Sequence, residues 1–203
     1  MAIQIHLEAT ETELFCSSKW WGDPGFPADM EYPVFPVEED GQTYDYPLTF
    51  VCQIDCADLE SLDPDGRLPH EGMLYVFAAL DAYAGYDSPV GNGPGPWPKG
   101  QVVVKYTRHI NFETFRACML VDDEDQPLTE PALRMTFSSC ADDAPVTRLL
   151  GGVPGTFLQI VSGTAGLDFG HGGVLLLDYE PADLERGFWN RVRGRLETLP
   201  GRE

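Results

Sequence analysis

The sequence predicts a β-rich α+β fold, and three observations lead to this class. The 203 residues are 43% hydrophobic, which is enough to bury one substantial core. The 21 glycines and 17 prolines divide the chain into short segments, which favours strands and turns over long helices. The C-terminal stretch differs, because its apolar residues follow helical spacing. We therefore predict a single compact domain over residues 1–203 with a C-terminal helix.

Several short segments are predicted to form strands. Residues 2–7 alternate between apolar and polar side chains, as a strand with one buried face does. Residues 48–55 and 72–80 are apolar runs of the kind that forms buried strands, and shorter runs follow at 101–106 and 132–137. Between these runs, residues 85–100 contain nine Gly or Pro and predict an exposed loop. Residues 56–60 are expected to form a single helical turn.

The predicted helix lies near the C-terminus. Four apolar residues recur there at intervals of four, which places them on one face of a helix: Leu184, Phe188, Val192 and Leu196. Pro181 suits the first turn of this helix, and Gly201 lies beyond its end. Gly187 and Gly194 weaken it by about 1 kcal/mol each relative to Ala, so packing has to hold it in place.

Three fragments occur twice, in the same order. "WGDPGF" from Trp21 resembles "GGVPGTF" from Gly151, "VCQI" resembles "FLQI", and "GMLYVF" resembles "GGVLLL". The second pair places Gln53 opposite Gln159. The spacing within the two sets differs, so the first copy would carry a large insertion. We predict two pseudo-duplicated halves, approximately 1–145 and 146–203.

Charge indicates the kind of partner. The net charge is −20, and residues 1–145 hold 26 acidic and 7 basic side chains, whereas residues 146–203 hold 7 and 6. This negative field disfavours nucleic acid and anionic membranes as partners and favours a basic protein, although solubility alone is an equally good explanation. The N-terminus has no basic, apolar leader, and the five cysteines have no paired spacing, which predicts a cytoplasmic protein with reduced thiols.

Residues 17–47 are the main candidates for partner binding. The stretch "SSKWWGDPGFPADMEYP" from Ser17 to Pro33 is rich in Trp, Gly and Pro, and an acidic run follows it. Aromatic anchors beside a charged rim are typical of a protein-binding surface, whereas buried aromatic residues would simply be core. The candidate contacts are Trp20, Trp21, Glu38, Glu39 and Asp40.

Evidence for catalysis is weak. The four histidines are widely separated, and neither "DPDG" at 63–66 nor "DDED" at 122–125 has the ligand spacing of a calcium loop. Ser138 to Cys140, "SSC", could place a nucleophile at a strand end with His109 or His171 as base, but a simple strand terminus explains it better. We predict no catalytic residue, no metal ligand and no cofactor.

A second hypothesis is a small-molecule-binding protein or a metal-dependent enzyme with its site between the two halves. A glutamine inside an apolar strand is costly unless its amide is satisfied. The two strand glutamines therefore either bond the turn of a "GxPG" segment or point into a shared cleft. In the second case the candidate ligand-binding residues are Gln53, His70, Gln159 and His171.

A set of ordered motifs carries a resemblance to a known family. They are "SKWWGDPGFPADMEYP", "PLTFVCQID" with "CADLE", "LPHEGMLYVF", "RLLGGVPGTFLQI", "GGVLLLDYEPADL" and "GFWNRV". The chain resembles the bacterial YwqG-like family, a domain of unknown function, over about residues 17–196. The resemblance implies a β-rich α+β domain with two related halves and no established enzymatic activity. Thr147 stands where the family has a histidine, so we do not expect this chain to have a function that depends on that histidine.

The resemblance also suggests a role. The family is similar, in its genomic neighbourhood, to acidic proteins encoded beside bacterial toxins, an association of kind and not of chemistry. Together with the charge, it leads us to expect a non-catalytic protein that binds a basic partner, such as an immunity protein that neutralises a toxin. The oligomeric state is left open.

Overall fold

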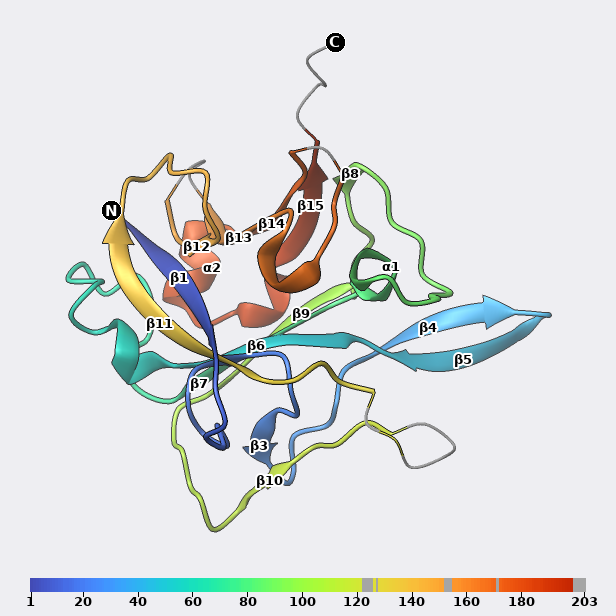
Figure 1. Cartoon of the computed structure of the whole chain (residues 1–203), viewed down its shortest axis with the longest axis horizontal. Helices are drawn as coiled ribbons and strands as arrows, with labels where there is room; N and C mark the ends of the chain where they lie inside the picture. The colour runs from blue at the N-terminus through green and yellow to red at the C-terminus, as the bar shows by residue number, and fades with distance from the viewer. Residues whose placement is uncertain (122–125, 127, 152–154, 171, 199–203) are drawn as a thin grey trace.

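The computed structural model describes residues 1–121, 126, 128–151, 155–170 and 172–198. Four features discussed above lie outside these residues in whole or part: the acidic run 122–125, the segment 152–154 of "GGVPGTF", His171 and Gly201. Within them, most regular structure is β-strand (Figure 1). The strands are β1 (Ala2–Ala9), β2 (Lys19–Trp20), β3 (Gly25–Pro27), β4 (Val34–Glu39), β5 (Gln42–Pro47), β6 (Thr49–Asp55), β7 (Met73–Ala78), β8 (Gly95–Pro96), β9 (Val102–Thr107), β10 (Phe115–Ala117), β11 (Leu133–Cys140), β12 (Arg148–Leu149), β13 (Thr156–Val161), β14 (Val174–Asp178) and β15 (Arg193–Glu197).

Helical structure is short throughout the described residues. The two α-helices are α1 (Asp81–Ala84) and α2 (Pro181–Glu185), and the 3-10 turns are η1 (Cys56–Leu59), η2 (Thr164–Gly166) and η3 (Trp189–Arg191). The turn η1 confirms the helical turn predicted at 56–60. No helix in the described part of the chain is long and apolar enough to cross a membrane.

Eleven strands form one antiparallel sheet. Their order is β8-β15-β14-β13-β12-β1-β11-β2-β6-β7-β9. The sheet curls strongly, as Figure 1 shows, and its two arms approach each other: a Cβ on Gly194 of β15 would lie 2.7 Å from Val102 of β9. Strands from both predicted ranges, 1–145 and 146–203, join in this one sheet.

The centre of the sheet joins the two arms reciprocally. β1 and β11 pair with each other along their whole length. β1 then pairs with β12, matching Ile3 to Leu149, while β11 pairs with β2, matching Leu133 to Trp20. β1 therefore extends the side of the sheet that starts with β12, and β11 extends the side that starts with β2. β2 and β12 occupy corresponding positions on the two sides.

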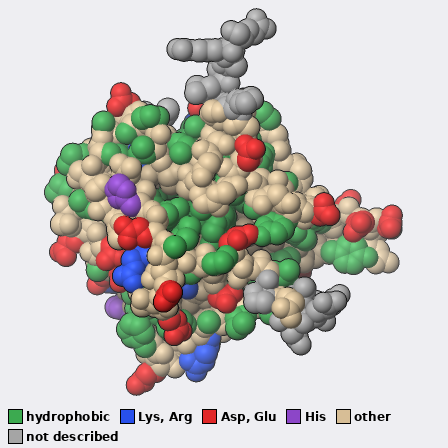
Figure 2. Space-filling view, in the orientation of Figure 1, with side chains coloured by type: hydrophobic (Ala, Val, Ile, Leu, Met, Phe, Trp, Pro, Cys, Tyr) green, Lys and Arg blue, Asp and Glu red, His purple; other side chains and the backbone are tan. Residues whose placement is uncertain are grey.

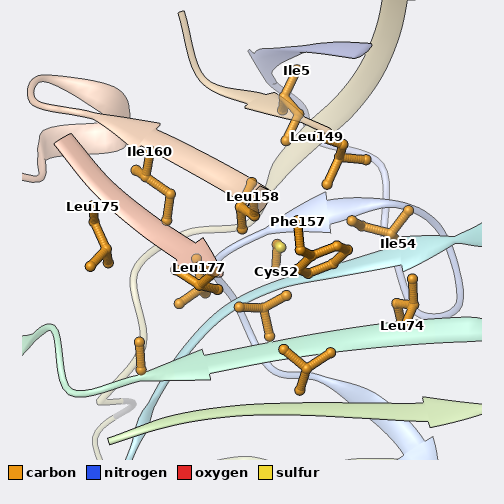
Figure 3. Packing of buried hydrophobic residues seen from close by; sticks show 14 of the residues in the cluster. Ile5, Cys52, Ile54, Leu74, Leu149, Phe157, Leu158, Ile160, Leu175 and Leu177 are labelled. Carbon is orange, nitrogen blue, oxygen red and sulfur yellow. The ribbon is translucent and has the colours of Figure 1, made fainter. Parts of the chain in front are cut away.

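The interior of the curl is filled by apolar side chains. Buried residues from both sides of the sheet form one cluster. Figure 3 shows Ile5 and Leu149 from β1 and β12, Ile54 and Leu74 from β6 and β7, and Leu177 from β14. Strand β7 is buried on both faces: Leu74 and Val76 belong to this cluster, whereas Tyr75 and Phe77 belong to a second one. This second cluster lies between β6-β7 and the small sheet of β3 and β10. The continuous apolar run at 72–80 is explained by these two buried faces.

The predicted strands at 2–7, 48–55, 101–106 and 132–137 are confirmed as β1, β6, β9 and β11, with ends that differ by at most three residues. The α+β class with a C-terminal helix is wrong. Helix α2 ends at Glu185, Gly187 follows with φ of 71°, and residues 193–197 form β15 between β14 and β8. Residues four apart share a face in a strand as well as in a helix, so the interval of four did not distinguish the two.

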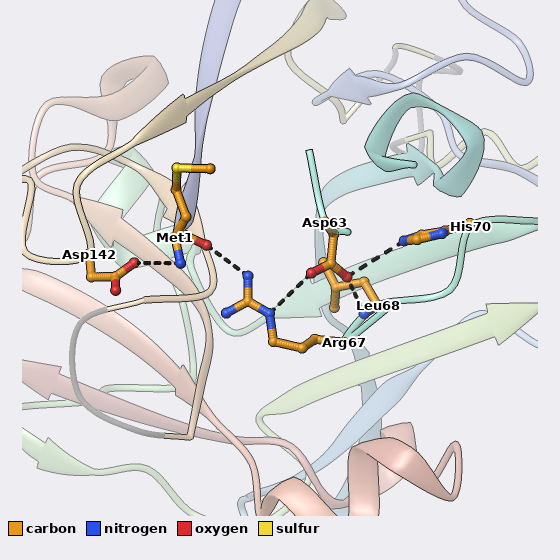
Figure 4. A network of polar contacts seen from close by, with 6 residues as sticks. All are labelled: Met1, Asp63, Arg67, Leu68, His70 and Asp142. Carbon is orange, nitrogen blue, oxygen red and sulfur yellow. Dashed lines mark hydrogen bonds and ion pairs between the residues drawn. The ribbon is translucent and has the colours of Figure 1, made fainter. Parts of the chain in front are cut away.

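The N-terminus is tied to the loop before β7 by a polar network, shown in Figure 4. The carboxylate of Asp63 is completely buried and accepts hydrogen bonds from the Leu68 amide (2.7 Å) and from Nε of Arg67 (3.0 Å). Arg67 also donates through Nη2 to the carbonyl of Met1 (2.7 Å), and the Met1 ammonium lies 3.2 Å from Asp142. Asp63 therefore connects this loop to the start of β1.

Candidate functional site

The two tryptophans of the segment 17–33 lie at the end of β2. Trp20 has no exposed surface and Trp21 is 5% exposed, and their rings meet edge to face at 5.8 Å. Trp20 is therefore core, because no partner can reach it in this conformation, and its predicted contact role is corrected on that ground. Trp21 differs in that one side of it borders a cavity described below.

The backbone after β2 turns sharply. Trp21 and Gly22 both have left-handed φ values, 59° and 71°, a conformation costing about 1 kcal/mol or more for a side chain other than Gly. The same pair occurs after β12, where Leu150 and Gly151 have φ of 56° and 80°. Gly and Pro in "WWGDPGF" thus serve the turn out of the sheet, which explains part of the composition of this segment.

Gln53 has a structural role. Its side chain is fully buried in β6, where its oxygen accepts from the Gly25 amide (3.0 Å) and its amide nitrogen donates to the carbonyls of Phe15 (2.8 Å) and Ser17 (2.9 Å). The expectation that Gln53 bonds the turn of its own "GxPG" segment is confirmed by the contact with Gly25. With these three bonds the amide has little capacity left for a ligand.

Gln159 lies in β13, at the position on the other side of the sheet that corresponds to Gln53 in β6. Its amide nitrogen donates to the carbonyls of Val146 (2.9 Å) and Ala144 (3.5 Å). Gln53 alternates with Cys52 and Ile54, and Gln159 alternates with Leu158 and Ile160, all of which belong to the interior cluster. Both glutamine side chains therefore point away from the interior and share no cleft there.

His70 is not among the hydrogen-bond partners of either glutamine. Its Nε2 is 3.6 Å from the Asp63 carboxylate in the network of Figure 4, beyond hydrogen-bond distance. The fourth residue proposed for this site, His171, lies outside the described residues. Apolar side chains fill the interior of the curled sheet, so the described residues Gln53, His70 and Gln159 do not form the ligand site that was predicted there.

Ser138 contacts a histidine that the sequence did not indicate. The Nε2 of His6 lies 2.7 Å from the Ser138 hydroxyl across the β1-β11 pair. His109, which the sequence offered as a base, is not among the hydrogen-bond partners of "SSC", and His171 lies outside the described residues. Ser138 to Cys140 end β11, as the strand-terminus interpretation predicts.

The acidic candidates form a projecting arm. Strands β4 and β5 pair from Val34 with Pro47 to Glu39 with Gln42, and Asp40 and Gly41, both with positive φ, make the two-residue turn. The arm extends away from the body in Figure 1, and Figure 2 shows acidic side chains gathered at its end. Glu38, Glu39 and Asp40 are all exposed. Residues 20–66 contain twelve acidic side chains and neither Lys nor Arg.

A cavity of about 640 Å³ lies at the base of this arm. Its walls come from the end of β2, from β5 and β6, from α1 and from residues 120 and 128–130. Aromatic rings and carboxylates make up much of the lining: Trp21, Tyr32, Tyr46, Phe50, Tyr86, Asp81, Asp87 and Glu130. No Lys, Arg or His is among the described lining residues.

Hydrogen bonds hold two of these carboxylates in place. Asp81 accepts from the Tyr46 hydroxyl (2.7 Å) and from the Thr49 hydroxyl (2.5 Å), and Glu130 accepts from the Tyr86 hydroxyl. Burial, together with the bond to Asp81, raises the pKa of Tyr46 to about 12, and the bond to Glu130 raises the pKa of Tyr86. Both phenols therefore stay protonated at neutral pH and act as hydrogen-bond donors to these carboxylates.

Residues 18–150 match the sequence model of a family described as a domain of unknown function, DUF1963. The match covers well over half of the chain. The chain belongs to the DUF1963 family. No curated protein matches it significantly. Both the acidic arm and the cavity of the DUF1963 domain lie within the matched residues.

The sequence did not indicate most of the cavity residues of the DUF1963 domain. Asp81 and Asp87 lie in one segment and Glu130 in another, and no pattern in the sequence links the two segments. The lack of basic residues from 20 to 66 was the one usable signal. A hollow of about 730 Å³ at residues 145–174 is lined largely by glycine and offers few side-chain groups. Among the described residues, no three His, Cys, Asp or Glu side chains are placed to hold a metal ion.

Proposed function

We propose that this DUF1963 protein is a non-catalytic binding protein whose partner is a basic protein. The observation that carries the proposal is the projecting β4-β5 arm, with Glu38, Glu39 and Asp40 exposed at its tip. A rigid two-residue turn presents these charges together, so little side-chain and loop freedom is lost on binding. The overall charge of −20 would steer a basic partner toward this face.

The residues that contact the partner are revised from the sequence prediction. Glu38, Glu39 and Asp40 remain, Trp20 is removed, and exposed Tyr44 on the same arm is added as an aromatic contact. Trp21 would contribute only through the cavity at the base of the arm. The mechanism is occlusion: the arm and its base cover a basic functional surface of the partner.

The finer parts of the proposal follow from the same charge and from the family resemblance. We take the chain as YwqG-like and cytoplasmic, with a toxin-neutralising, immunity-type role as the specific form of this function. Nucleic acid and anionic membranes are disfavoured as partners because both would be repelled by the acidic arm.

The test compares two variants that lose the same charge in different places. Glu38→Gln/Glu39→Gln/Asp40→Asn neutralises the tip, and Asp143→Asn/Glu180→Gln/Glu185→Gln neutralises three exposed carboxylates elsewhere. Proteins retained from a lysate of the native host by the immobilised wild-type chain are identified and purified, and their association rates are then measured. We expect the tip variant to lose the partner and the control variant to keep it.

Salt provides a second criterion. For the purified partner, the association rate should fall between about 50 mM and about 500 mM salt, because screening weakens steering between exposed charges. A partner that is not basic, an association rate that salt does not change, or full binding by the tip variant would overturn the proposal.

A further inference from the structure

The cavity at the base of the arm is chemically matched to an organic cation. Its aromatic walls offer π faces, and three carboxylates, Asp81, Asp87 and Glu130, supply negative charge. None of its described lining residues carries a positive charge that would compete for these carboxylates. Aromatic faces beside acidic groups are the arrangement that recognises guanidinium and ammonium ions.

The carboxylates keep acceptor capacity. Each oxygen of Asp81 accepts one hydrogen bond, from Tyr46 or from Thr49, and a carboxylate oxygen can accept a second. These two bonds also fix the orientation of Asp81, so it is positioned before a ligand arrives. Asp87 is exposed at the rim, where an incoming cation would meet it first.

The cavity has room for more than a small ion. A volume of about 640 Å³ lies in the range of sites that enclose a whole side chain or a drug-sized molecule. A guanidinium is planar, stacks on aromatic rings and donates several hydrogen bonds in one plane, whereas an ammonium is a compact and strongly hydrated charge. The tyrosine and tryptophan walls therefore favour arginine over lysine.

We propose that this cavity binds an arginine side chain presented by the basic partner, an inference that rests on the proposed function. Tyr46 and Pro47 line the cavity and also end β5, the strand that leads to the acidic tip. Tyr46 is six positions along the chain from Asp40, which in an extended chain is a distance of about 20 Å. An extended basic segment that places an arginine in the cavity thus reaches Glu38 and Glu39 with residues further along.

The test uses a defined probe, N-acetyl-arginine amide, with N-acetyl-citrulline amide as its neutral isostere and N-acetyl-lysine amide as the alternative cation. Binding to the full chain is followed by NMR chemical-shift changes. We expect saturable changes at the amides of Trp21, Ala84 and Tyr86, with the citrulline probe at least tenfold weaker and the lysine probe intermediate.

Variants locate the effect. Asp87→Asn and Glu130→Gln should each weaken the arginine probe several-fold, and Asp65→Asn, an exposed carboxylate in the turn before Arg67, should leave it unchanged. Asp81→Asn should weaken it most, and the spectrum of the free variant shows whether the arm base keeps its fold. Equal binding of the citrulline probe, shifts outside the cavity, or unchanged affinity in both Asp87→Asn and Glu130→Gln would overturn the inference.

The two proposals fail separately. If the arginine probe does not bind but the tip variant loses the basic partner, the cavity inference is wrong and the proposed function stands. If the probe binds in the cavity while the tip variant keeps full partner binding, the arm is not the binding element and the proposed function is wrong.

Discussion

The side-chain amides of Gln53 and Gln159 make the same kind of contact at corresponding positions of the curled sheet, because each donates to two backbone carbonyls. Gln53 bridges the carbonyls of Phe15 and Ser17, and Gln159 bridges those of Ala144 and Val146. In each case the bridged segment leads directly into the neighbouring short strand, β2 or β12. Each glutamine thus fastens the chain as it enters the centre of the sheet.

This arrangement predicts unequal costs for removing the two amides. Gln53→Leu should lower the free energy of unfolding by about 3 kcal/mol, because it leaves the Gly25 amide and two carbonyls without their partner in a buried place. Gln159→Leu should cost about 1 to 2 kcal/mol, because its bond to Ala144 is long, at 3.5 Å. Urea unfolding measures both values.

Gln42→Leu is the matched control for these two substitutions. Gln42 is exposed on the arm, so its replacement should change the free energy of unfolding by less than about 0.5 kcal/mol. A Gln53→Leu variant as stable as this control would show that the three hydrogen bonds add nothing to stability.

The burial of Asp63 predicts that two carboxylates of one turn, Asp63 and Asp65, contribute very differently to stability. Asp63→Ala should destabilise the protein by about 3 kcal/mol, because the buried Leu68 amide and the Arg67 guanidinium both lose their acceptor. Asp65→Ala changes an exposed carboxylate two residues away and should have an effect below about 0.5 kcal/mol. Thermal and urea unfolding of both variants give the comparison, and equal effects would contradict the assigned role of Asp63.

The elements predicted well from the sequence are those with an unambiguous burial pattern. β1 alternates, and β7 is apolar throughout because both of its faces are covered. The cost of burying an amide correctly indicated that Gln53 would be satisfied by hydrogen bonds, and it indicated the Gly25 turn. Two-residue strands such as β2 and β12 are too short to show any pattern.

The cavity and the arm were harder to predict for different reasons. The cavity is assembled from six separate stretches of the chain, and which of them meet depends on the curl of the sheet. The arm projects from the body, so most of its residues are exposed on both strands and do not alternate between polar and apolar.

Asp55 predicts a pH dependence of stability. Burial raises the pKa of its carboxyl, and the neighbouring charge of Asp58 adds to this, so the folded protein holds this proton more tightly than the unfolded chain does. Stability from this group is therefore greatest at low pH and falls as pH rises from the unfolded pKa, about 3.9, through the raised folded value.

Asp55→Asn removes this loss and keeps an oxygen that can accept from the Ala57 amide, as Asp55 does at 3.1 Å. The variant should thus gain stability relative to the wild type between about pH 3 and about pH 7. Urea midpoints at several pH values test this, with Asp65→Asn as the control for the change in net charge. A difference between Asp55→Asn and wild type that stays constant with pH, or that shrinks as pH rises, would refute the assignment.

Substitution of Gly194 distinguishes the observed strand β15 from the helix that the sequence pattern predicted. In β15, an added Cβ would lie 2.7 Å from Val102 and 3.1 Å from the Trp97 ring, so Gly194→Ala should cost about 2 kcal/mol by overpacking. Gly187→Ala should cost about 1 kcal/mol, because Gly187 has φ of 71° and only backbone strain opposes the new side chain. In a helix both substitutions would instead stabilise by up to about 1 kcal/mol each. Thermal unfolding of the two variants decides between the alternatives, because the sign of the change is opposite for a strand and for a helix.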